Sequence, residues 1–467
     1  MHADATALAE AIGSGQLTAR QAMETSLAAA TSNASLGAIT HLDEKKGRAS
    51  ADAFDALPVD QRAAMHFGGV PTLAKDLGGP FEGFPVSAGS SSIPRRGGMA
   101  DSDLAIRFRR SGFCLFGLTT SPEFGLSLAS EPAMGPVSRN PLAPHLSSGG
   151  SSGGAAAAVA AGIVSIAHAT DAGGSIRVPA ACCGLIGLKP GRGAIPAGPS
   201  YGNYLGGIAS ELAICRSVRD TVSIFANVSG DARGPFPPVL QVPAKDEVLR
   251  VGVLTDTGAD MPTAPERLEA VEAAARSLEK KGHRIIPVKW TEIEQLALAS
   301  ATAFADIVCI NLAETVERLS ADLSGTEEIT QAVLERGLDM RGTDAWRAMN
   351  MLAFISRDLW RLFDDIDCLL TPMLATAPKP IGSFPTDHRD VEAHFQRMTA
   401  FAPLAPLANI SGFPAITLPF GEDGKGLPLP VQLLAPMGQE MRLLALAAHL
   451  EKEERWSHRF PVAGFAQ

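Results

Sequence analysis

Three features that would direct the chain to an export route, a membrane or a nucleic acid are missing from its 467 residues. The N-terminal residues MHADATALAEAIGSGQLTAR lack the basic start and the apolar stretch of a secretory signal. The longest apolar run is Ala-rich and is interrupted by Ser165 and His168, so we expect no segment that spans a membrane. The net charge is -10, and no cluster of Lys and Arg is present that would follow phosphates, which excludes nucleic acid as an expected partner.

Cysteine is scarce as well, and its spacing excludes two uses. The six cysteines form no CxxC pair, and two of them, Cys182 and Cys183, are adjacent in an apolar stretch. Buried thiols in a reducing compartment explain this pattern better than disulfides or a metal site. We therefore expect a cytoplasmic protein that holds no metal.

What is present is the composition of a soluble globular protein, with 46% hydrophobic and 19% charged residues. Segments of strand and helix character alternate along the chain. This order predicts one large α/β domain over residues 1–467, with a mixed β-sheet core flanked by helices on both faces. The Pro-rich stretch 231–247 is the best connector in the chain, but it need not separate two domains.

Local patterns place the individual elements. Thr18 is a plausible N-cap, and Ser121, Pro122 and Glu123 have the chemistry of a helix start with the acid in the first turn. His168 on a strand is expected to be a packed, hydrogen-bonded core residue. The expected helices are 3–30 with a break at 13–16, 103–110, 153–162, 266–283 and 439–454. The expected strands are 69–75, 113–118, 163–169, 250–254, 284–290, 368–373, 415–420 and 430–435.

The most unusual segment is SSGGSSGG, residues 147–154. A flexible linker has this composition, but a linker joins folded units, whereas this run leads directly into the Ala-rich segment 155–169. A phosphate-binding loop needs Lys and Ser or Thr after its second glycine, and alanines follow here. Both interpretations are weak, which leaves a catalytic one.

The catalytic interpretation has two versions. In the first, Gly149 to Gly153 form the G-x-S-x-G nucleophile elbow of an α/β-hydrolase esterase, with Ser151 as nucleophile and an Asp and a His farther along. An elbow requires a strand directly before it, and the two prolines of NPLAPHLS resist a strand. In the second version, Ser151 and Ser175 lie in two Gly/Ser loops that fold back to one sheet edge. Lys75 at a strand end would then complete a relay in which burial keeps the lysine neutral and able to accept a proton.

The second version is supported by a resemblance. GVPTLAKD (69–76), GGSSGG (149–154), TDAGGSIRVPAACCGLIGLKP (170–190) and NISGFPAITLPFG (409–421) closely resemble the amidase signature family, in order. The match runs from about residue 8 to residue 454, and the signature core covers about residues 69–220. Within it, SEPAMGPVSRNP (130–141) resembles the corresponding stretch of bacterial 6-aminohexanoate cyclic-dimer hydrolases. The resemblance implies the amidase signature fold.

The resemblance also implies a Ser-cisSer-Lys triad. Ser175 matches the nucleophile that forms an acyl-enzyme, Ser151 matches the proton-shuttling serine after a cis peptide bond, and Lys75 matches the general base. The backbone N–H groups of Ala172, Gly173, Gly174 and Ser175 would form the oxyanion hole, where side chains would block the substrate oxygen.

Further residues are expected around the triad. Asp171 and Arg177 would pair across the loop as a brace, and Ser152 would support the site. Tyr201 and Tyr204, the only tyrosines in the chain, lie where the family often shapes its acyl pocket. Substrate contact and ordinary loop packing both remain open for them.

The expected function is therefore hydrolysis of the carboxamide bond of small molecules, with water as the second substrate and without metal or cofactor. An alternative is the amidase-fold subunit of a glutamine-dependent tRNA amidotransferase. Such subunits would be expected to carry KPTYG, where this chain has KPGRG from Lys189 to Gly193. A non-catalytic binding relative is a third alternative, and a homodimer, common in the family, stays open.

Overall fold

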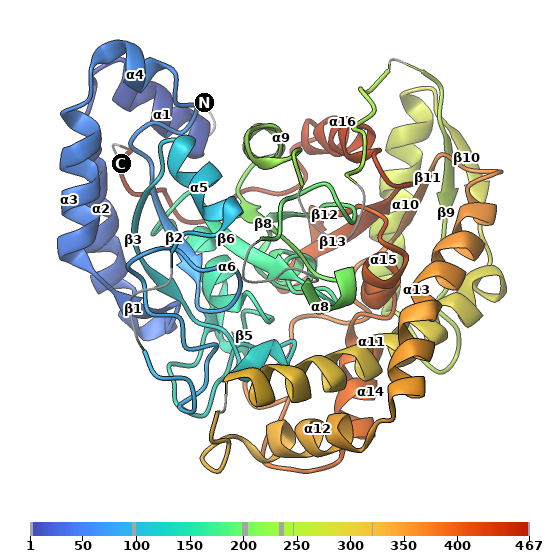
Figure 1. Ribbon diagram of the computed structural model, residues 1–467. Helices are drawn as coiled ribbons and strands as arrows, with labels where there is room; N and C mark the ends of the chain where they lie inside the picture. Colours follow the sequence, from blue (N-terminus) through green and yellow to red (C-terminus); the bar gives the residue numbers. More distant parts are fainter. Residues whose placement is uncertain are drawn as a thin grey trace.

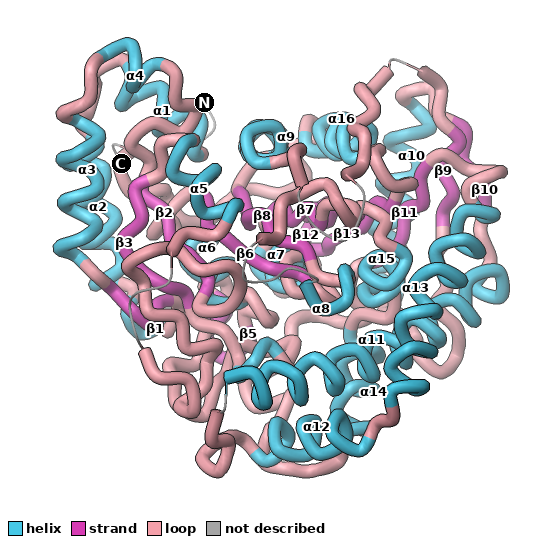
Figure 2. The backbone as a smooth tube through the Cα atoms, viewed as in Figure 1, coloured by secondary structure: helices cyan, strands magenta, loops and turns pink. Residues whose placement is uncertain are grey.

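Eight strands rich in β-branched and apolar residues form one mixed sheet through the middle of the molecule (Figures 1 and 2). Their order is β10-β9-β11-β13-β12-β7-β8-β6. The β10/β9 and β9/β11 pairs are parallel and the remaining pairs are antiparallel. This computed structural model describes residues 3–95, 100–198, 204–232, 238–245, 247–319 and 321–465.

The elements have the following bounds. The strands are β1 Ile39–Leu42, β2 Pro71–Lys75, β3 Cys114–Thr119, β4 Arg139–Asn140, β5 Ala143–Ser147, β6 Ile166–Asp171, β7 Ile186–Lys189, β8 Ser210–Cys215, β9 Arg250–Val253, β10 Arg284–Pro287, β11 Cys368–Pro372, β12 Ala415–Glu422 and β13 Pro428–Leu434. The helices are α1 Ala5–Gly13, α2 Ala19–Ser32, η1 Ala34–Leu36, α3 Glu44–Asp55, α4 Val59–Ala63, α5 Asp103–Arg110, η2 Glu123–Gly125, α6 Gly153–Ala160, α7 Arg177–Cys183, α8 Tyr204–Gly207, α9 Val218–Val228, α10 Pro265–Lys280, α11 Trp290–Leu319, α12 Glu328–Asp339, α13 Gly342–Leu362, α14 Val391–Phe401, α15 Ala405–Ser411 and α16 Glu440–Glu451.

The two faces of the large sheet pack against different helices, as strand register shows. Leu369, Leu434 and Ala415 are opposite one another on β11, β13 and β12, and they belong to the core cluster that includes residues of α11, α13 and α15. Their neighbours along the strands point to the other face, because side chains alternate along a strand. Those neighbours belong to the cluster that contains the apolar residues of α10 and α16. The mixed sheet flanked by helices on both faces is therefore confirmed.

A smaller sheet, β1-β3-β2, lies beside the β6 edge of the large sheet. Side chains join the two sheets: the Thr72 hydroxyl on β2 donates a hydrogen bond to the Ile166 carbonyl on β6, with an O···O distance of 2.8 Å. The Nδ1 atom of buried His168, also on β6, accepts from the backbone N–H of Lys75 at 3.2 Å. These contacts fix the end of β2, and with it Lys75, against the end of β6, and they confirm His168 as a packed core residue.

The Ala-rich helix α6 lies at the junction of these elements, and all eight of its residues are buried. The backbone N–H of Gly154 donates to the Thr120 carbonyl just after β3, at 3.1 Å. A Cβ atom at position 154 would overlap the backbone of Thr120 and the carbonyl of Ala38. Glycine is therefore needed here for a close approach between helix and strand.

Most local expectations are confirmed, and the exceptions are informative. Thr18 caps α2 in a full capping box, and the two strands and the helix expected over 250–290 form as the parallel βαβ unit β9-α10-β10. The helix start at Ser121 is wrong, because only the 3-10 turn η2 forms there. Glu123 is buried instead of capping, and its carboxylate accepts hydrogen bonds from the hydroxyls of Ser90 and Thr330 and from the N–H of Glu327. It therefore ties this turn to the start of α12.

Two further expectations need correction. NPLAPHLS does contain a strand, β5, although β5 lies outside the large sheet: it pairs with β4 in a two-stranded ribbon, and its Leu146 forms an isolated bridge with Pro380. A helix was also missing from the prediction: α11, Trp290–Leu319, is the longest in the described part of the chain and has the length and hydropathy to cross a membrane. Half of its most apolar window is buried within the protein, where it packs on α12, α13 and α15 (Figure 1). This packing is that of a core helix.

We expect Gly154→Ala to lower the free energy of unfolding by about 1–3 kcal/mol, because the added methyl group must push helix and strand backbones apart. Urea unfolding followed by circular dichroism would measure this. Gly13→Ala is the matched control, since Gly13 is exposed at the end of α1 and an added Cβ meets nothing within 4 Å. Equal midpoints for the two variants would contradict the close packing of α6.

Candidate active site

A buried lysine and two hydroxyl groups meet where the two sheets touch. Lys75, the last residue of β2, places its Nζ 2.8 Å from the Ser151 Oγ and 2.8 Å from the Thr170 Oγ1. Ser151 follows a cis peptide bond from Gly150 in the turn between β5 and α6, and Thr170 is on β6. Three segments far apart in the sequence therefore converge on one amine.

Burial decides the protonation of this lysine. Lys75 is only 1% exposed, and loss of solvation lowers its pKa to about 7, although the negative charges of Asp171 and Glu211 oppose the shift. In a large fraction of the molecules, the Lys75 amine is therefore neutral at neutral pH. In that form it has a lone pair that can accept a proton from the Ser151 hydroxyl.

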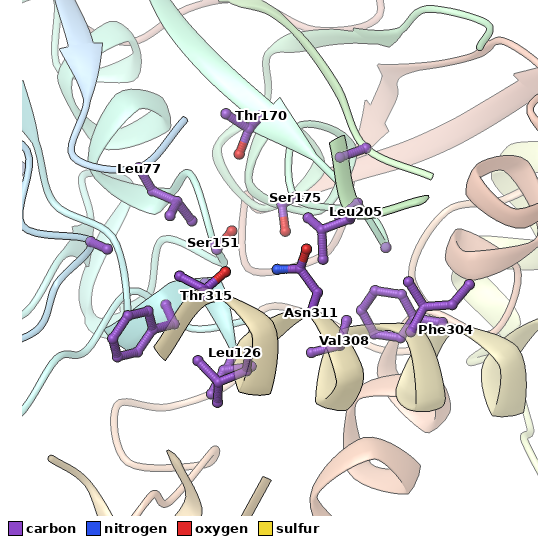
Figure 3. A pocket seen from close by; sticks show the side chains of 18 of the residues that line it. Leu77, Leu126, Ser151, Thr170, Ser175, Leu205, Phe304, Val308, Asn311 and Thr315 are labelled. Atoms are coloured by element: carbon purple, nitrogen blue, oxygen red, sulfur yellow. The ribbon is translucent and has the colours of Figure 1, made fainter. Parts of the chain in front are cut away.

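Ser175 lies on the loop between β6 and α7, and its side chain points into the same cavity as Ser151 (Figure 3). The two loops are joined by a hydrogen bond from the Ser152 N–H to the Ser175 carbonyl, at 3.3 Å. The Ser152 hydroxyl also donates to the carbonyl of Thr170 and accepts from the N–H of that residue, at 3.2 and 3.3 Å. Ser152 thus anchors the turn of Ser151 to β6, the supporting position that the sequence analysis gave it.

The predicted brace between Asp171 and Arg177 forms, and both side chains are fully buried. The Arg177 Nε is 2.9 Å from the Asp171 Oδ2, and the Arg177 Nη2 is 3.0 Å from the Asp171 Oδ1. Burial alone would raise the pKa of Asp171, but the charge and hydrogen bonds of Arg177, with Lys189 and Asn409, hold it well below its usual range. Asp171 is therefore ionised at neutral pH.

The same carboxylate shapes the loop that carries Ser175. It accepts the backbone N–H groups of Gly174 at 2.7 Å and Ile176 at 3.2 Å. The prediction that Gly174 contributes to the oxyanion hole is therefore wrong, because its N–H is turned toward Asp171. Those of Ala172, Gly173 and Ser175 make no hydrogen bond within the described part of the chain, and these three residues line the cavity.

Gly173 also has a packing reason to be glycine. A Cβ atom there would lie 2.6 Å from the ring of Phe304 on α11, which faces this loop across the cavity. A side chain at this position would therefore force the Phe304 ring to move.

The cavity has a volume of about 840 Å³ and is lined mainly by apolar side chains. Its size is that of a site for a small organic molecule. Among the lining residues that the structure describes, the charged side chains are Glu314 and Arg318 in the last turns of α11, which form an ion pair of 3.1 Å. Apolar lining residues include Leu77, Leu126, Leu205, Ile307, Val308 and Met349.

Some predicted residues cannot be placed in this site. Tyr201 lies outside the described residues, and Tyr204 begins α8 without a described side chain. Within the described ranges, no group of three His, Cys, Asp or Glu side chains is arranged to hold a metal ion. All six cysteines are buried free thiols, as expected.

The sequence analysis missed three residues of the site. Thr170 lies in the motif TDAGGSIR but was given no role, although its hydroxyl, like that of Ser151, accepts a hydrogen bond from the Lys75 Nζ. The Asn409 side chain accepts a hydrogen bond from Arg177 and donates one to Asp171, although it is 232 or more residues away in the sequence. Its place in the motif NISGFP was the only signal of this role in the sequence. Asn311 follows the apolar residues Ile307 and Val308 on the face of α11 that lines the cavity, and this change from apolar to polar residues was a readable signal.

Comparisons with known proteins agree with this geometry. The Amidase family model matches residues 21–444. The chain belongs to the amidase family. This amidase is 33% identical to the putative amidase AmiC of Mycobacterium tuberculosis over 97% of its own length and 95% of that protein. It is also 33% identical to the 6-aminohexanoate-cyclic-dimer hydrolase of Pseudomonas sp. (strain NK87), covering 98% of this chain and 96% of the relative.

Solved structures extend the likeness to the fold. The structure of 6-aminohexanoate cyclic dimer hydrolase complexed with substrate superposes with a TM-score of 0.90 at 29% identity, covering 98% of both chains. A bacterial aryl acylamidase of the amidase signature enzymes gives 0.83 at 24% identity, which supports the fold alone. This amidase is therefore a hydrolase of carbon–nitrogen amide bonds with the amidase signature fold. The amidotransferase-subunit alternative is not favoured by these relatives.

The nucleophile-elbow alternative is not favoured by the geometry either. A strand does precede the Gly/Ser run, contrary to expectation, but it is not part of the large sheet. The hydrogen-bond partner of the Ser151 hydroxyl is a lysine amine and not the histidine that an elbow requires.

We expect Arg177→Met to lower the free energy of unfolding by about 3–5 kcal/mol, because it leaves the Asp171 carboxylate buried without its charge partner. Arg341→Met is the control: Arg341 pairs with Asp344 on the surface and its side chain is 75% exposed. Urea midpoints should fall for the first variant and stay unchanged for the second. A small effect at Arg177 would show that the loop holds its shape without the brace.

Proposed function

We propose that this amidase cleaves neutral carboxamides of small molecules through an acyl-enzyme on Ser175. Ser151 relays protons in this proposal, and Lys75 is the base. The observation that carries it is the contact of 2.8 Å between the Lys75 Nζ and the Ser151 Oγ, with the lysine buried and its pKa lowered to about 7. A serine hydroxyl needs a base to become nucleophilic, and here the relay ends on an amine that can accept a proton.

Acylation begins when the Ser175 Oγ attacks the amide carbon. Its proton passes to the Ser151 Oγ as the Ser151 proton passes to the Lys75 Nζ, so the lysine becomes charged. The amide oxygen becomes an oxyanion and is stabilised by the free N–H groups of Ala172, Gly173 and Ser175. No hydrogen bond joins Ser175 and Ser151 in the substrate-free protein, and such contacts often tighten only when substrate binds.

The remaining steps return the protons. The tetrahedral intermediate collapses, the C–N bond breaks, and the leaving nitrogen takes a proton from Lys75 through Ser151. The amine or ammonia departs and leaves an ester of Ser175. Water then attacks this ester along the same relay, so the acid is released and Ser175 recovers its proton.

The cavity supports neutral substrates with apolar groups. A charged group would lose its hydration in an apolar cavity, where the ion pair of Glu314 and Arg318 offers no free charge to replace it. The 6-aminohexanoate-cyclic-dimer hydrolase relative, by its name, acts on a cyclic amide, which is consistent with this class. Linear amides with apolar groups of similar size belong to the same class.

We expect Ser175→Ala to abolish Ser175-directed phosphonylation and amide turnover, because the attacking oxygen is removed. Intact-mass analysis after treatment with a fluorophosphonate, followed by peptide mapping, would show one adduct on Ser175 in the wild type and none in the variant. An adduct on Ser151 or Ser152 would instead support the elbow interpretation.

The pH dependence of kcat/KM should report Lys75. Since the neutral amine is the base, kcat/KM rises with pH through an apparent pKa of about 7. The charge of Glu211 favours the protonated lysine, so Glu211→Gln removes a factor that raises this pKa, and the rising limb moves to lower pH. A profile that is flat between pH 6 and pH 8 in both proteins would argue against Lys75 as the base.

A further inference from the structure

The wall of the cavity opposite the oxyanion hole contains an unpaired carboxamide. Asn311 projects from α11 toward the side chains of Ser151 and Ser175 (Figure 3). Its neighbours along this face of the helix, Phe304, Ile307 and Val308, are apolar and line the cavity. From Asn311 onward this face becomes polar, because Glu314 and Thr315 line the cavity one turn later, so this part of α11 departs from the pattern of a helix that packs only on a core.

Asn311 also lacks a partner within the protein. Most polar side chains of the cavity already have one: Thr170 and Ser151 bond Lys75, and Thr399 donates to the Phe395 carbonyl. Asn311 makes no side-chain hydrogen bond to any described residue, and it is half-buried. The carboxamide of Asn311 is therefore open to the cavity. A bound molecule that covers it displaces the water there, so a molecule that supplies a hydrogen-bond partner is favoured over one that does not.

The position of Asn311 decides which atom of the substrate it meets. The carbonyl oxygen of a bound amide turns toward the free N–H groups of the β6-α7 loop, and Ser175 lies at the carbonyl carbon. The nitrogen of the amide must lie near Ser151, which supplies its proton. The carboxamide oxygen of Asn311 can then accept the N–H hydrogen that this nitrogen carries.

On this proposed mechanism, we propose that Asn311 is a specificity-determining residue that selects amides bearing an N–H. By holding that hydrogen, Asn311 turns the lone pair of the nitrogen toward Ser151 as the tetrahedral intermediate forms. Esters and N-alkylated tertiary amides have no such hydrogen, so they gain nothing from Asn311. The substrate class is therefore primary and secondary carboxamides.

The test uses matched substrates with the same acyl group. The kcat/KM values are measured for neutral acyl anilides of two to six carbons, for the corresponding phenyl esters and for the N-methyl anilides, after subtraction of the Ser175→Ala rate. Asn311→Leu keeps the branched shape and the number of heavy atoms of the side chain and removes its acceptor. We expect kcat/KM for anilides to fall about tenfold or more and that for esters to change less than threefold, in line with the loss of one hydrogen bond.

Two further variants separate a hydrogen bond from a general disturbance. Asn311→Asp keeps the acceptor oxygen and should retain the preference for anilides over esters, measured at pH 9, where a raised Lys75 pKa has less influence. Asn350→Leu makes the same substitution at an exposed position of α13 and should leave all rates unchanged. Equal urea midpoints for the wild type and Asn311→Leu would show that the fold is intact.

Each result bears on the inference. In Asn311→Leu, equal losses of kcat/KM for anilides and esters, or no loss for either, would overturn the inference and leave the triad in place. An Asn311→Asp variant that no longer prefers anilides over esters would do the same. A wild-type protein that is not phosphonylated on Ser175 would overturn the proposed function and the inference together. Phosphonylation of Ser175 without turnover of any anilide would overturn the inference alone.

Discussion

The arrangement of the site depends on the buried ion pair between Asp171 and Arg177. The carboxylate takes up the N–H of Gly174 and so turns this peptide away, which leaves the neighbouring N–H groups of Ala172, Gly173 and Ser175 facing the cavity. Arg177 extends the same network to β13 through Gln432 and to α15 through Asn409. A loop rich in glycine would otherwise sample many conformations, and the pair restricts it to one.

Asp171 and Lys75 are both buried, but burial affects their charge states differently. Asp171 is buried with a positive partner and stays charged, whereas Lys75 is buried beside hydroxyl groups and loses its charge readily. Asp171 and Glu211 limit how far the Lys75 pKa falls, so this amine stays close to the pH at which it works. Two buried ionisable groups in one site thus behave in opposite ways because their nearest partners differ.

Features that depend on residues close together in the sequence were predicted, whereas features that depend on contacts between distant residues were not. The cap at Thr18 and strand β2 follow from patterns a few residues long, and Lys75, Ser151 and Ser175 were found because their motifs are specific. The role of Glu123 was missed because its partners Glu327 and Thr330 lie more than 200 residues away. The direction of the Gly174 N–H was missed for a related reason, since residue types in a loop do not say which peptide faces the carboxylate.

The contact between the two sheets has a consequence for how activity appears during folding. The proposed nucleophile and the free N–H groups belong to the loop after β6, in the large sheet, whereas the proposed base arrives at the end of β2, in the small one. A chain in which only the large sheet has formed holds an ordinary, unreactive serine. In the proposed mechanism, chemical reactivity of the hydroxyl at position 175 therefore reports tertiary assembly, because the nucleophile and its base come from different sheets.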